Sequence, residues 1–344
     1  MRFPAFIVAM LVLIALPATP RLTKAAPPGG PPLDIKIGMS TPLDAKRNGS
    51  YVWTRAFADV MERAGARVRI YPNSALGGEK ERMDQVAIGR LEINETGGDE
   101  LARLSPLFHA MRPFEIESYD HLDRLLEHTS FLAEVNQELA DDDLILLDYV
   151  YTGDMVGLFT RGKPVRRIED LRSLRLRILS AADLNLLEAW KVRGVRVAWE
   201  EVAQALQTGM VDAYLNPPIV AVMFGHGNVL DYFTDLRMGP STRLMVTSRR
   251  WYESLSPAMR TTFARGVREA RAANRAWNAT AMKRDRSLLE KTGIEWIEMK
   301  PGDREAWKAL TRRIPRSRWE TPQAEARLRA MIEASRLAPR QVAQ

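Results

Sequence analysis

The sequence predicts an α/β protein made of two lobes that are built alike and joined by one long helix. In two separate stretches, residues 34–94 and 174–215, strands alternate with helices, an order typical of parallel α/β sheets. A third stretch, Ser256 to Lys291, has the apolar spacing of an unbroken helix, which would be about 50 Å long. That length exceeds one lobe of this size, so we expect the helix to span both lobes; a kinked pair of helices is the alternative.

The first unit begins with a strand, because apolar and polar residues alternate from Asp34 to Met39. A turn precedes the second helix, and Gly89 is expected to end that helix in a left-handed conformation. The other elements are a helix over Val52, Phe57, Val60 and Met61, a strand from Arg67 to Tyr71, a turn from Asn73 to Gly78, a helix from about Glu79, and a strand from Leu91 to Asn94.

The second unit repeats this order, and Gly209 is expected to stop its helix. Its segment 205–212 looks like segment 85–92 of the first unit, which favours two lobes of one design. Because strand–helix–strand units are common, a chance likeness is the alternative. The predicted elements are strands from Leu174 to Leu179, Val195 to Trp199 and Val211 to Leu215, and helices over Leu184 to Trp190 and Glu201 to Gln207.

The long helix has clear signals at both ends. Ser256 is the expected N-cap, Pro257 occupies the first turn, and Gly293 follows the last turn. The apolar residues that recur at helical spacing are Met259, Phe263, Val267, Ala270 and Trp277.

The composition is that of a folded globular protein. Of the 344 residues, 46% are hydrophobic and 27% charged, which argues against disorder. The formal net charge is +7, but arginines often lie beside acids, as Arg268 does beside Glu269. Basic runs with interleaved aromatic residues do not occur, so we expect a solvated basic surface and no nucleic-acid partner.

The sequence lacks the motifs of common catalytic and metal sites. It has no cysteine, which excludes disulfides, thiolate nucleophiles and a lipid-anchored export signal that needs a cysteine. The four histidines, at positions 109, 121, 128 and 226, do not have the close helical spacing of a zinc motif. We therefore expect no metal and no cofactor, although a secreted hydrolase or lyase with unrecognised carboxylates stays an alternative.

The N-terminus resembles a secretory signal peptide. Arg2 precedes an apolar stretch from Phe3 to Leu16, and small residues follow at Ala25 and Ala26. The apolar stretch is short for a membrane span, so cleavage after residue 26 is expected, with an uncleaved anchor as the alternative. The mature protein should then function outside the cytoplasm, in the periplasm.

Several short motifs occur in order between Asp34 and Ala330. Together these motifs resemble the DctP-type substrate-binding proteins of TRAP (tripartite ATP-independent periplasmic) transporters. The motifs are Tyr71-Pro72-Asn73-Ser74-Ala75-Leu76-Gly77-Gly78-Glu79, Gly89-Arg90-Leu91-Glu92, Arg112-Pro113-Phe114, Glu169-Asp170-Leu171-Arg172-Ser173-Leu174-Arg175-Leu176-Arg177, Glu201-Val202, Ala205-Leu206-Gln207-Thr208-Gly209 with Asp212, Asn216-Pro217, Ser248-Arg249-Arg250-Trp251 and Leu255-Ser256-Pro257.

The resemblance implies a two-lobed periplasmic binding protein fold with a ligand cleft between the lobes. It implies no enzymatic activity, but capture of a small organic acid and its delivery to the membrane subunits of a TRAP transporter. Delivery to a sensory receptor is the alternative within the binding class. The expected division is 34–154 plus 243–282 for lobe I, 155–242 plus 283–330 for lobe II, and a C-terminal tail from residue 331.

Arg177 is the main candidate for ligand binding. It lies near the end of a predicted strand, where an α/β lobe places its cleft, and the resemblance assigns this arginine to the ligand. A guanidinium can donate two parallel hydrogen bonds to one carboxylate. A solvated arginine at a strand end is the alternative.

Five further residues are weaker candidates for the pocket. By resemblance, Asn216 supports the same carboxylate and Trp199 forms an aromatic wall, with a turn asparagine and a core tryptophan as the alternatives. Ser180, Ser40 and Tyr214 complete the set, whereas Glu79 is interpreted as an acid at a helix N-terminus and not as a ligand contact.

The chain also departs from the family pattern. The family often has a second arginine just after the first lobe crossing, where this sequence has Met155-Val156-Gly157-Leu158. Before Asn216, the family usually has Gln-Glu, and this sequence has Tyr214-Leu215. Glycines at 97 and 98 stand where bulkier polar residues can occur. We therefore expect a less polar pocket, better suited to a monocarboxylate with an apolar or aromatic body than to a sugar acid.

Overall fold

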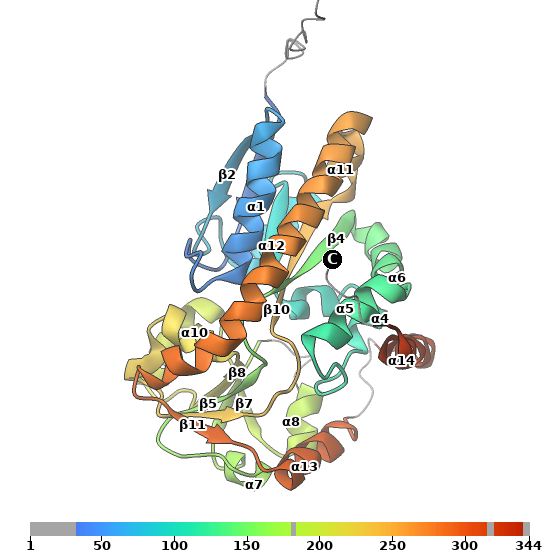
Figure 1. Ribbon diagram of the computed structural model, residues 1–344. Coiled ribbons are helices and arrows are strands. Elements are labelled where there is room, and N and C mark those ends of the chain that lie inside the picture. The colour runs from blue at the N-terminus through green and yellow to red at the C-terminus, as the bar shows by residue number, and fades with distance from the viewer. Residues whose placement is uncertain (1–31, 180–183, 315–319, 340–344) are drawn as a thin grey trace, which may run out of the picture. The chain divides into compact units, whose positions relative to one another are not determined.

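Two β-sheets divide the protein into two lobes (Figure 1). The computed structural model describes residues 32–179, 184–314 and 320–339. The expected signal peptide, residues 1–26, lies outside the described residues. We use lobe I for the part built on the first sheet and lobe II for the part built on the second.

The sheet of lobe I has five strands in the order β2-β1-β3-β10-β4. Strands β1, β2 and β3 run parallel, while β10 runs antiparallel to both β3 and β4. The strands are β1 (Asp34–Gly38), β2 (Arg67–Tyr71), β3 (Ile93–Thr96), β4 (Leu144–Tyr151) and β10 (Thr242–Ser248).

The sheet of lobe II has six strands in the order β11-β9-β5-β8-β6-β7. Strand β6 runs parallel to β7 and β8, and β5 runs antiparallel to β8 and β9. The strands are β5 (Gly157–Thr160), β6 (Arg175–Ile178), β7 (Arg193–Arg196), β8 (Ala213–Asn216), β9 (Tyr232–Asp235) and β11 (Glu295–Glu298).

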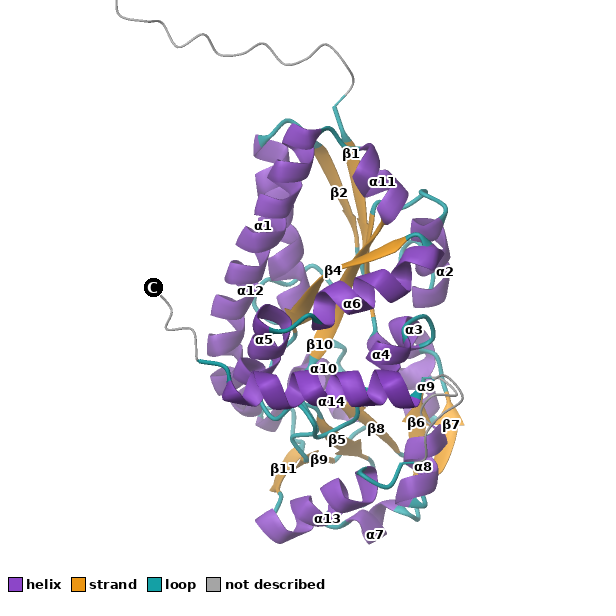
Figure 2. Ribbon diagram, turned by 90° about the vertical axis from the view of Figure 1, so that its right-hand side faces the viewer, coloured by secondary structure: helices purple, strands orange, loops and turns teal. Residues whose placement is uncertain are grey.

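Helices cover both sheets and bury an apolar core in each lobe (Figure 2). Those of lobe I are α1 (Gly49–Arg63), α2 (Glu79–Ala87), α3 (Gly98–Ala102), α4 (Pro106–His109), α5 (Tyr119–His128), α6 (Phe131–Glu138), the 3-10 turn η1 (Leu139–Asp142), α11 (Arg249–Ser254) and α14 (Pro322–Leu337). Those of lobe II are α7 (Ile168–Leu171), α8 (Leu184–Trp190), η3 (Trp199–Glu201), α9 (Val202–Gln207), α10 (Pro218–Met223), η4 (His226–Asn228) and α13 (Pro301–Thr311).

The long helix α12 (Pro257–Glu290) is continuous and contacts both lobes, as predicted (Figure 1). The Ser256 hydroxyl caps it by accepting a hydrogen bond from the N–H of Met259 (3.2 Å). Its first half packs on α1 and β4, and its second half on α10 and β11. The kinked pair of helices, the alternative interpretation, is therefore excluded.

The buried stripe of α12 changes from apolar to polar where the chain passes between the lobes. Phe263 and Ala270 lie in the core of lobe I, but the next buried positions include Asn274, Asn278 and Asp285. Two segments, residues 152–156 and 236–241, cross between the lobes here. They are not part of either sheet, so their backbone groups have no hydrogen bonds within a strand ladder. Buried backbone groups need other partners, and the polar side chains of α12 provide them.

Each of the polar residues of α12 binds the backbone of the first crossing segment or of the residue before it. Asn274 accepts from the N–H of Tyr151 (2.8 Å), and Asn278 from that of Gly153 (2.9 Å). Asp285 Oδ2 accepts from the N–H of Asp154 (3.1 Å).

The two crossing segments are also hydrogen-bonded to each other. The N–H of Thr152 donates to Ser241 O (3.1 Å), and that of Val156 donates to Gly239 O (3.0 Å). From α5, the Tyr119 hydroxyl lies 2.6 Å from Gly153 O and accepts from the N–H of Ser241 (3.0 Å). We call this set of contacts the crossing clamp; it ties α5, α12 and both crossing segments together.

The glycine stops were predicted correctly, but the strands after them begin two residues later than expected. Gly89 and Gly209 have φ of 72° and 71°, the left-handed conformation that ends a helix. Strands β3 and β8 then begin at Ile93 and Ala213, because the chain turns before it enters the sheet. Trp199 is not in a strand: β7 ends at Arg196, and Trp199 begins η3.

The exact lobe boundaries of the sequence analysis remain a proposal, and two features bear on them. Helix α14 continues past residue 331, where a tail was expected to begin, and it packs against α4 and α5 of lobe I (Figure 2). Phe114, within the range expected for lobe I, lies in an apolar cluster of lobe II with Leu158 and Met238. Apolar periodicity therefore does not predict which lobe each of these segments packs against.

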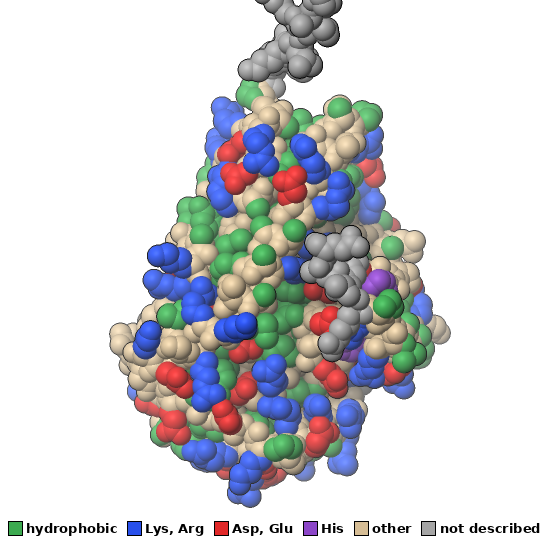
Figure 3. Space-filling view, in the orientation of Figure 1, with side chains coloured by type: hydrophobic (Ala, Val, Ile, Leu, Met, Phe, Trp, Pro, Cys, Tyr) green, Lys and Arg blue, Asp and Glu red, His purple; other side chains and the backbone are tan. Residues whose placement is uncertain are grey.

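In the part of the chain described here, no helix combines the length and apolar character needed to cross a bilayer. On the face seen in Figure 3, basic and acidic side chains lie close together.

We predict that Tyr119→Phe destabilises the protein by about 1–3 kcal/mol, because it leaves the buried N–H of Ser241 without its partner. The measurement is urea unfolding. Tyr252→Phe is the matched control, since the Tyr252 hydroxyl makes no hydrogen bond to the described residues. An equal, small change in both variants would contradict the role of Tyr119 in the crossing clamp.

Candidate functional site

A cavity of about 340 Å³ lies between the lobes, next to the crossing clamp. Its volume is within the usual range for small-molecule sites. The residues lining it from lobe I are Ser40, Thr41, Arg47, Asn48, Glu79, Gly97, Gly98 and Asp99; those from lobe II are Arg177, Leu179, Trp199, Leu215, Asn216, Pro217, Val220, Met223 and Phe224; and those at or beside the crossing segments are Thr152, Val156, Ser241, Thr242 and Arg243.

Arg177 reaches this cavity because of the alternation along β6. Leu176 and Ile178 point into the apolar core of lobe II, so Arg175 and Arg177 point to the other face. Arg175 lies at the surface and forms two hydrogen bonds of 2.8 Å to Asp212. Arg177 is only 7% exposed and lines the cavity. The alternative of a solvated strand-end arginine therefore describes Arg175 and not Arg177.

The Arg177 side chain is held in place from two sides. Its Nε–H donates to Val197 O (3.0 Å), which fixes the plane of the guanidinium. The guanidinium carbon lies 5.5 Å from the centroid of the Trp199 ring, within the range of a cation–π interaction. Because the side chain is already fixed by its neighbours, it loses little conformational entropy when an anion binds.

Trp199 and Asn216 also line the cavity. Trp199 packs edge-on against Phe224, with ring centroids 4.9 Å apart, which fixes the indole as a wall. Asn216 is the last residue of β8 and half-buried. Within the described part of the chain its side-chain amide makes no hydrogen bond, so both the amide oxygen and nitrogen are available to a ligand.

The remaining three predicted residues have different outcomes. Ser40 lines the cavity, but its hydroxyl is already bound to Glu79 Oε1 (3.1 Å) and Arg82 Nη2 (2.6 Å). Tyr214 does not line it: the side chain is fully buried behind the wall and bonds to His226 Nδ1 (3.1 Å). Its ring packs edge-on against the Trp199 indole, with ring centroids 6.3 Å apart, so it supports the wall and does not itself line the cavity. Ser180 lies outside the described residues.

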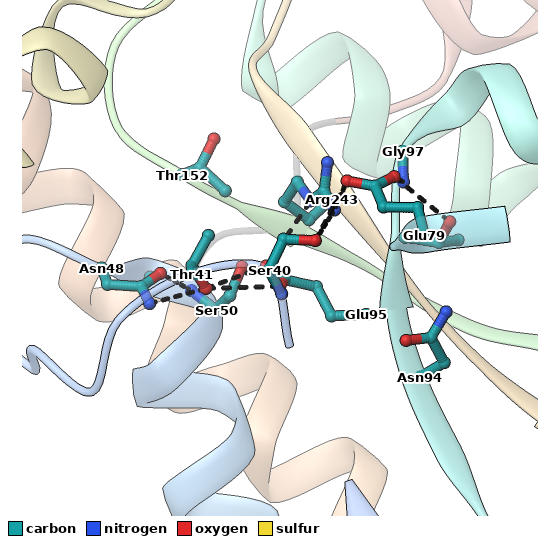
Figure 4. Close-up of polar contacts among 12 residues, drawn as sticks. Ser40, Thr41, Asn48, Ser50, Glu79, Asn94, Glu95, Gly97, Thr152 and Arg243 are labelled. Carbon is teal, nitrogen blue, oxygen red and sulfur yellow. Dashed lines mark hydrogen bonds and ion pairs between the residues drawn. The ribbon is translucent and has the colours of Figure 1, made fainter. Parts of the chain in front are cut away.

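Lobe I contributes a charged wall that was not predicted from the sequence (Figure 4). Arg243, on β10, lies 2.6 Å from Glu79 Oε1 and 3.5 Å from Glu95 Oε1. Glu95 also accepts from the N–H of Ser40 (2.9 Å). The signal was a charged side chain directly before the apolar run Leu244-Met245-Val246, because a charge next to a buried strand needs an ionic partner.

Glu79 belongs to this wall and is more than a helix N-terminal acid. Burial opposes its ionisation, but Arg243, the N–H of Gly97 (2.7 Å) and Arg82 outweigh burial and lower its pKa. Burial likewise opposes the charge of Arg243, and Glu79 and Glu95 raise its pKa above the ordinary value. The wall is thus a set of ion pairs satisfied within lobe I.

Asp99 is the least compensated acid of the cavity. Burial raises its pKa to about 6, and the nearby Glu79 and Glu100 add to the effect. A Cβ atom on Gly97 would lie 2.6 Å from Asp99 Oδ1, 3.0 Å from Glu79 Oε2 and 3.4 Å from Arg243 Nη1. The charged groups therefore converge at Gly97, and a larger residue there would displace them.

Among the described residues, no three side chains of His, Asp or Glu are grouped to hold a metal ion. His226 is buried behind Trp199, and burial lowers its pKa to about 4, so it is neutral at neutral pH.

We predict that Asp99→Asn stabilises the protein at pH 7.5 by about 1–3 kcal/mol and has little effect at pH 4. The folded-state pKa lies near 6, above the ordinary 3.8, so the stability that protonated Asp99 provides is lost as the pH rises through 6. Urea unfolding at pH 4, 6 and 7.5 measures it, with Asp59→Asn, at an exposed ion pair with Arg55, as control. If Asp99→Asn stabilised the protein most at pH 4, the raised pKa of Asp99 would be contradicted.

Comparisons with known proteins agree with this architecture. The family model of bacterial extracellular solute-binding protein family 7, DctP, matches residues 52–321. The chain is similar to the sialic acid-binding periplasmic protein SiaP of Vibrio cholerae, at 26% identity over 55% of this chain and 59% of SiaP. It is also similar to the C4-dicarboxylate-binding periplasmic protein DctP of Rhodobacter capsulatus, at 24% identity over 84% of this chain and 87% of that protein.

A solved structure shows the same fold. The sugar acid binding protein DctPAm of Advenella mimigardefordensis, in complex with galactonate, superposes with a TM-score of 0.80 at 18% identity. The superposition covers 88% of this chain and 99% of that protein. The family model matches more than half of the chain, and the two-lobed fold agrees with it. The chain therefore belongs to the DctP family of bacterial extracellular solute-binding proteins, a family of binding proteins and not of enzymes.

Proposed function

We propose that this protein captures a small organic acid in the cavity between its lobes and delivers it to the membrane subunits of a TRAP transporter. The observation that most supports this function is the position of Arg177, a nearly buried guanidinium on the wall of a cavity that both lobes line. Asn216 is beside it on the same wall, with an amide available for the same anion. A carboxylate fits both groups.

The relatives support an acid as the ligand class. Galactonate, sialic acid and C4-dicarboxylates, which are named for three similar proteins, each contain a carboxylate. The rest of each molecule differs, so the shared carboxylate is the group that a shared arginine would recognise. The identity of the acid for this chain depends on the other walls of the cavity.

Binding would favour the closed arrangement of the lobes. A ligand that contacts Arg177 of lobe II and the wall of lobe I stabilises the state in which both walls are close. In the present arrangement the lobes already meet at the edge of the cavity, where the Ser74 hydroxyl donates to Glu200 Oε1 (2.9 Å). This exposed hydrogen bond is weak, so most of the closing energy would come from the ligand.

Export is part of the proposal. Residues 1–26 would direct secretion to the periplasm and would then be removed, leaving a protein that meets its ligand outside the cytoplasm. The N-terminal sequence of protein recovered from the periplasm tests this step.

We predict that Arg177→Ala weakens binding of the organic acid at least tenfold, through loss of one or two charge-assisted hydrogen bonds worth about 1.5–3 kcal/mol each. A thermal-shift screen of organic acids identifies the ligand, and calorimetry measures its affinity.

Arg175→Ala is the matched control for this prediction. It removes an arginine from the same strand whose partner is Asp212 at the surface, and should change affinity less than twofold. Equal affinity of wild type and Arg177→Ala, with both folded, would remove Arg177 from the site.

A further inference from the structure

The two walls of the cavity differ in charge and in polarity. The charged residues on the wall of lobe I are Arg47, Glu79, Asp99 and Arg243, with Arg82 and Glu95 directly behind it. On the wall of lobe II, the side chains beside Arg177 and Asn216 are mostly apolar. They are Leu179, Trp199, Leu215, Pro217, Val220, Met223 and Phe224.

The cations of lobe I lie beside acids of lobe I, and Arg47 is paired with Asp44 (3.3 Å). Arg243 bonds to Glu79 (2.6 Å) and lies beside Glu95. Arg82 donates to Asn94 Oδ1 (2.8 Å) and to the Ser40 hydroxyl (2.6 Å) and is fully buried. With three arginines, two glutamates, Asp44 and Asp99, this wall offers no net positive charge to an incoming anion.

A second carboxylate on the ligand would therefore meet an unfavourable environment. With its first carboxylate at Arg177, it would lie against the apolar side chains of lobe II, against the acids at Gly97, or near Arg47, which is already paired with Asp44. Burial of a carboxylate without a cation is costly, and a nearby acid adds repulsion. Ligand hydroxyls against the apolar wall would lose their hydrogen bonds to water without replacement.

We propose that the cavity selects monocarboxylates with an apolar or aromatic body, and rejects dicarboxylates and polyhydroxylated sugar acids. This inference rests on the proposed function, because it takes Arg177 as the carboxylate site. Trp199, Met223 and Phe224 form the surface for the apolar body, and Glu79 and Asp99 exclude a second negative charge.

The test compares acids of matched shape by calorimetry at pH 7.5. Phenylacetate, 4-methylpentanoate and 4-carbamoylphenylacetate carry one carboxylate, whereas 4-carboxyphenylacetate adds a second in place of the amide at nearly equal size. Succinate and D-glucuronate represent the rejected classes. At least one acid with a single carboxylate should bind tenfold or more tightly than succinate and D-glucuronate, and the amide should bind tenfold or more tightly than 4-carboxyphenylacetate.

The Asp99→Asn variant tests the cause of the selection. Removal of this acid should reduce the preference for the amide over 4-carboxyphenylacetate at least threefold. Asp59→Asn, at an exposed pair on α1, should leave the preference unchanged. An unchanged preference in Asp99→Asn would show that the acid does not exclude the second charge, and would overturn that part of the inference.

The outcomes separate this inference from the proposed function. If succinate or D-glucuronate binds most tightly and its binding depends on Arg177, the selection proposed here is wrong while the organic-acid function stands. If no acid of the panel binds in a manner that depends on Arg177, both proposals fail.

Discussion

The crossing clamp is the constraint on which the rest of the structure depends. Two segments leave the sheets to pass between the lobes, and their backbone groups are buried where no strand can pair with them. Asn274, Asn278 and Asp285 of α12, and Tyr119 of α5, satisfy these groups. Because both lobes are fixed to one helix, the walls of the cavity face each other over a short distance. Lobe movement must then be absorbed by the few residues of these segments.

The two walls of the cavity, one from each lobe, differ in how their charged side chains are stabilised. In lobe I, the buried charges of Arg243 and Arg82 are stabilised within the lobe, because Glu79, Glu95 and backbone oxygens surround them. Lobe II presents Arg177 among apolar side chains, held by Val197 O and the Trp199 ring. An anion that enters the cavity meets Arg177 on the wall of lobe II and, on the wall of lobe I, arginines that are already paired with acids. In this account, the family arginine recognises the carboxylate of the ligand, and the other side chains of the cavity determine which acid binds.

The sequence alone predicted the fold well and the site in part. Alternation, helical spacing and the glycine stops at 89 and 209 are local signals, and the strands after those two stops begin two residues later than expected. Arg177 was found through its strand-end position and the motif around it. Arg243 and Asp99 were missed because their role arises from ion pairs between β10, α2 and α3, elements far apart in the chain. Tyr214 was placed in the pocket from its position just before Leu215-Asn216, but its side chain is buried behind the wall, against His226 and Trp199.

The central claim is that Arg177 holds the carboxylate of the ligand between the lobes. The most direct test is a crystal structure of the protein with the acid that binds most tightly. The account predicts carboxylate oxygens about 2.7–2.9 Å from the Arg177 Nη atoms, with the body of the ligand against Trp199. A carboxylate bound instead at Arg243, or a ligand outside the cavity with Arg177 turned to solvent, would contradict it.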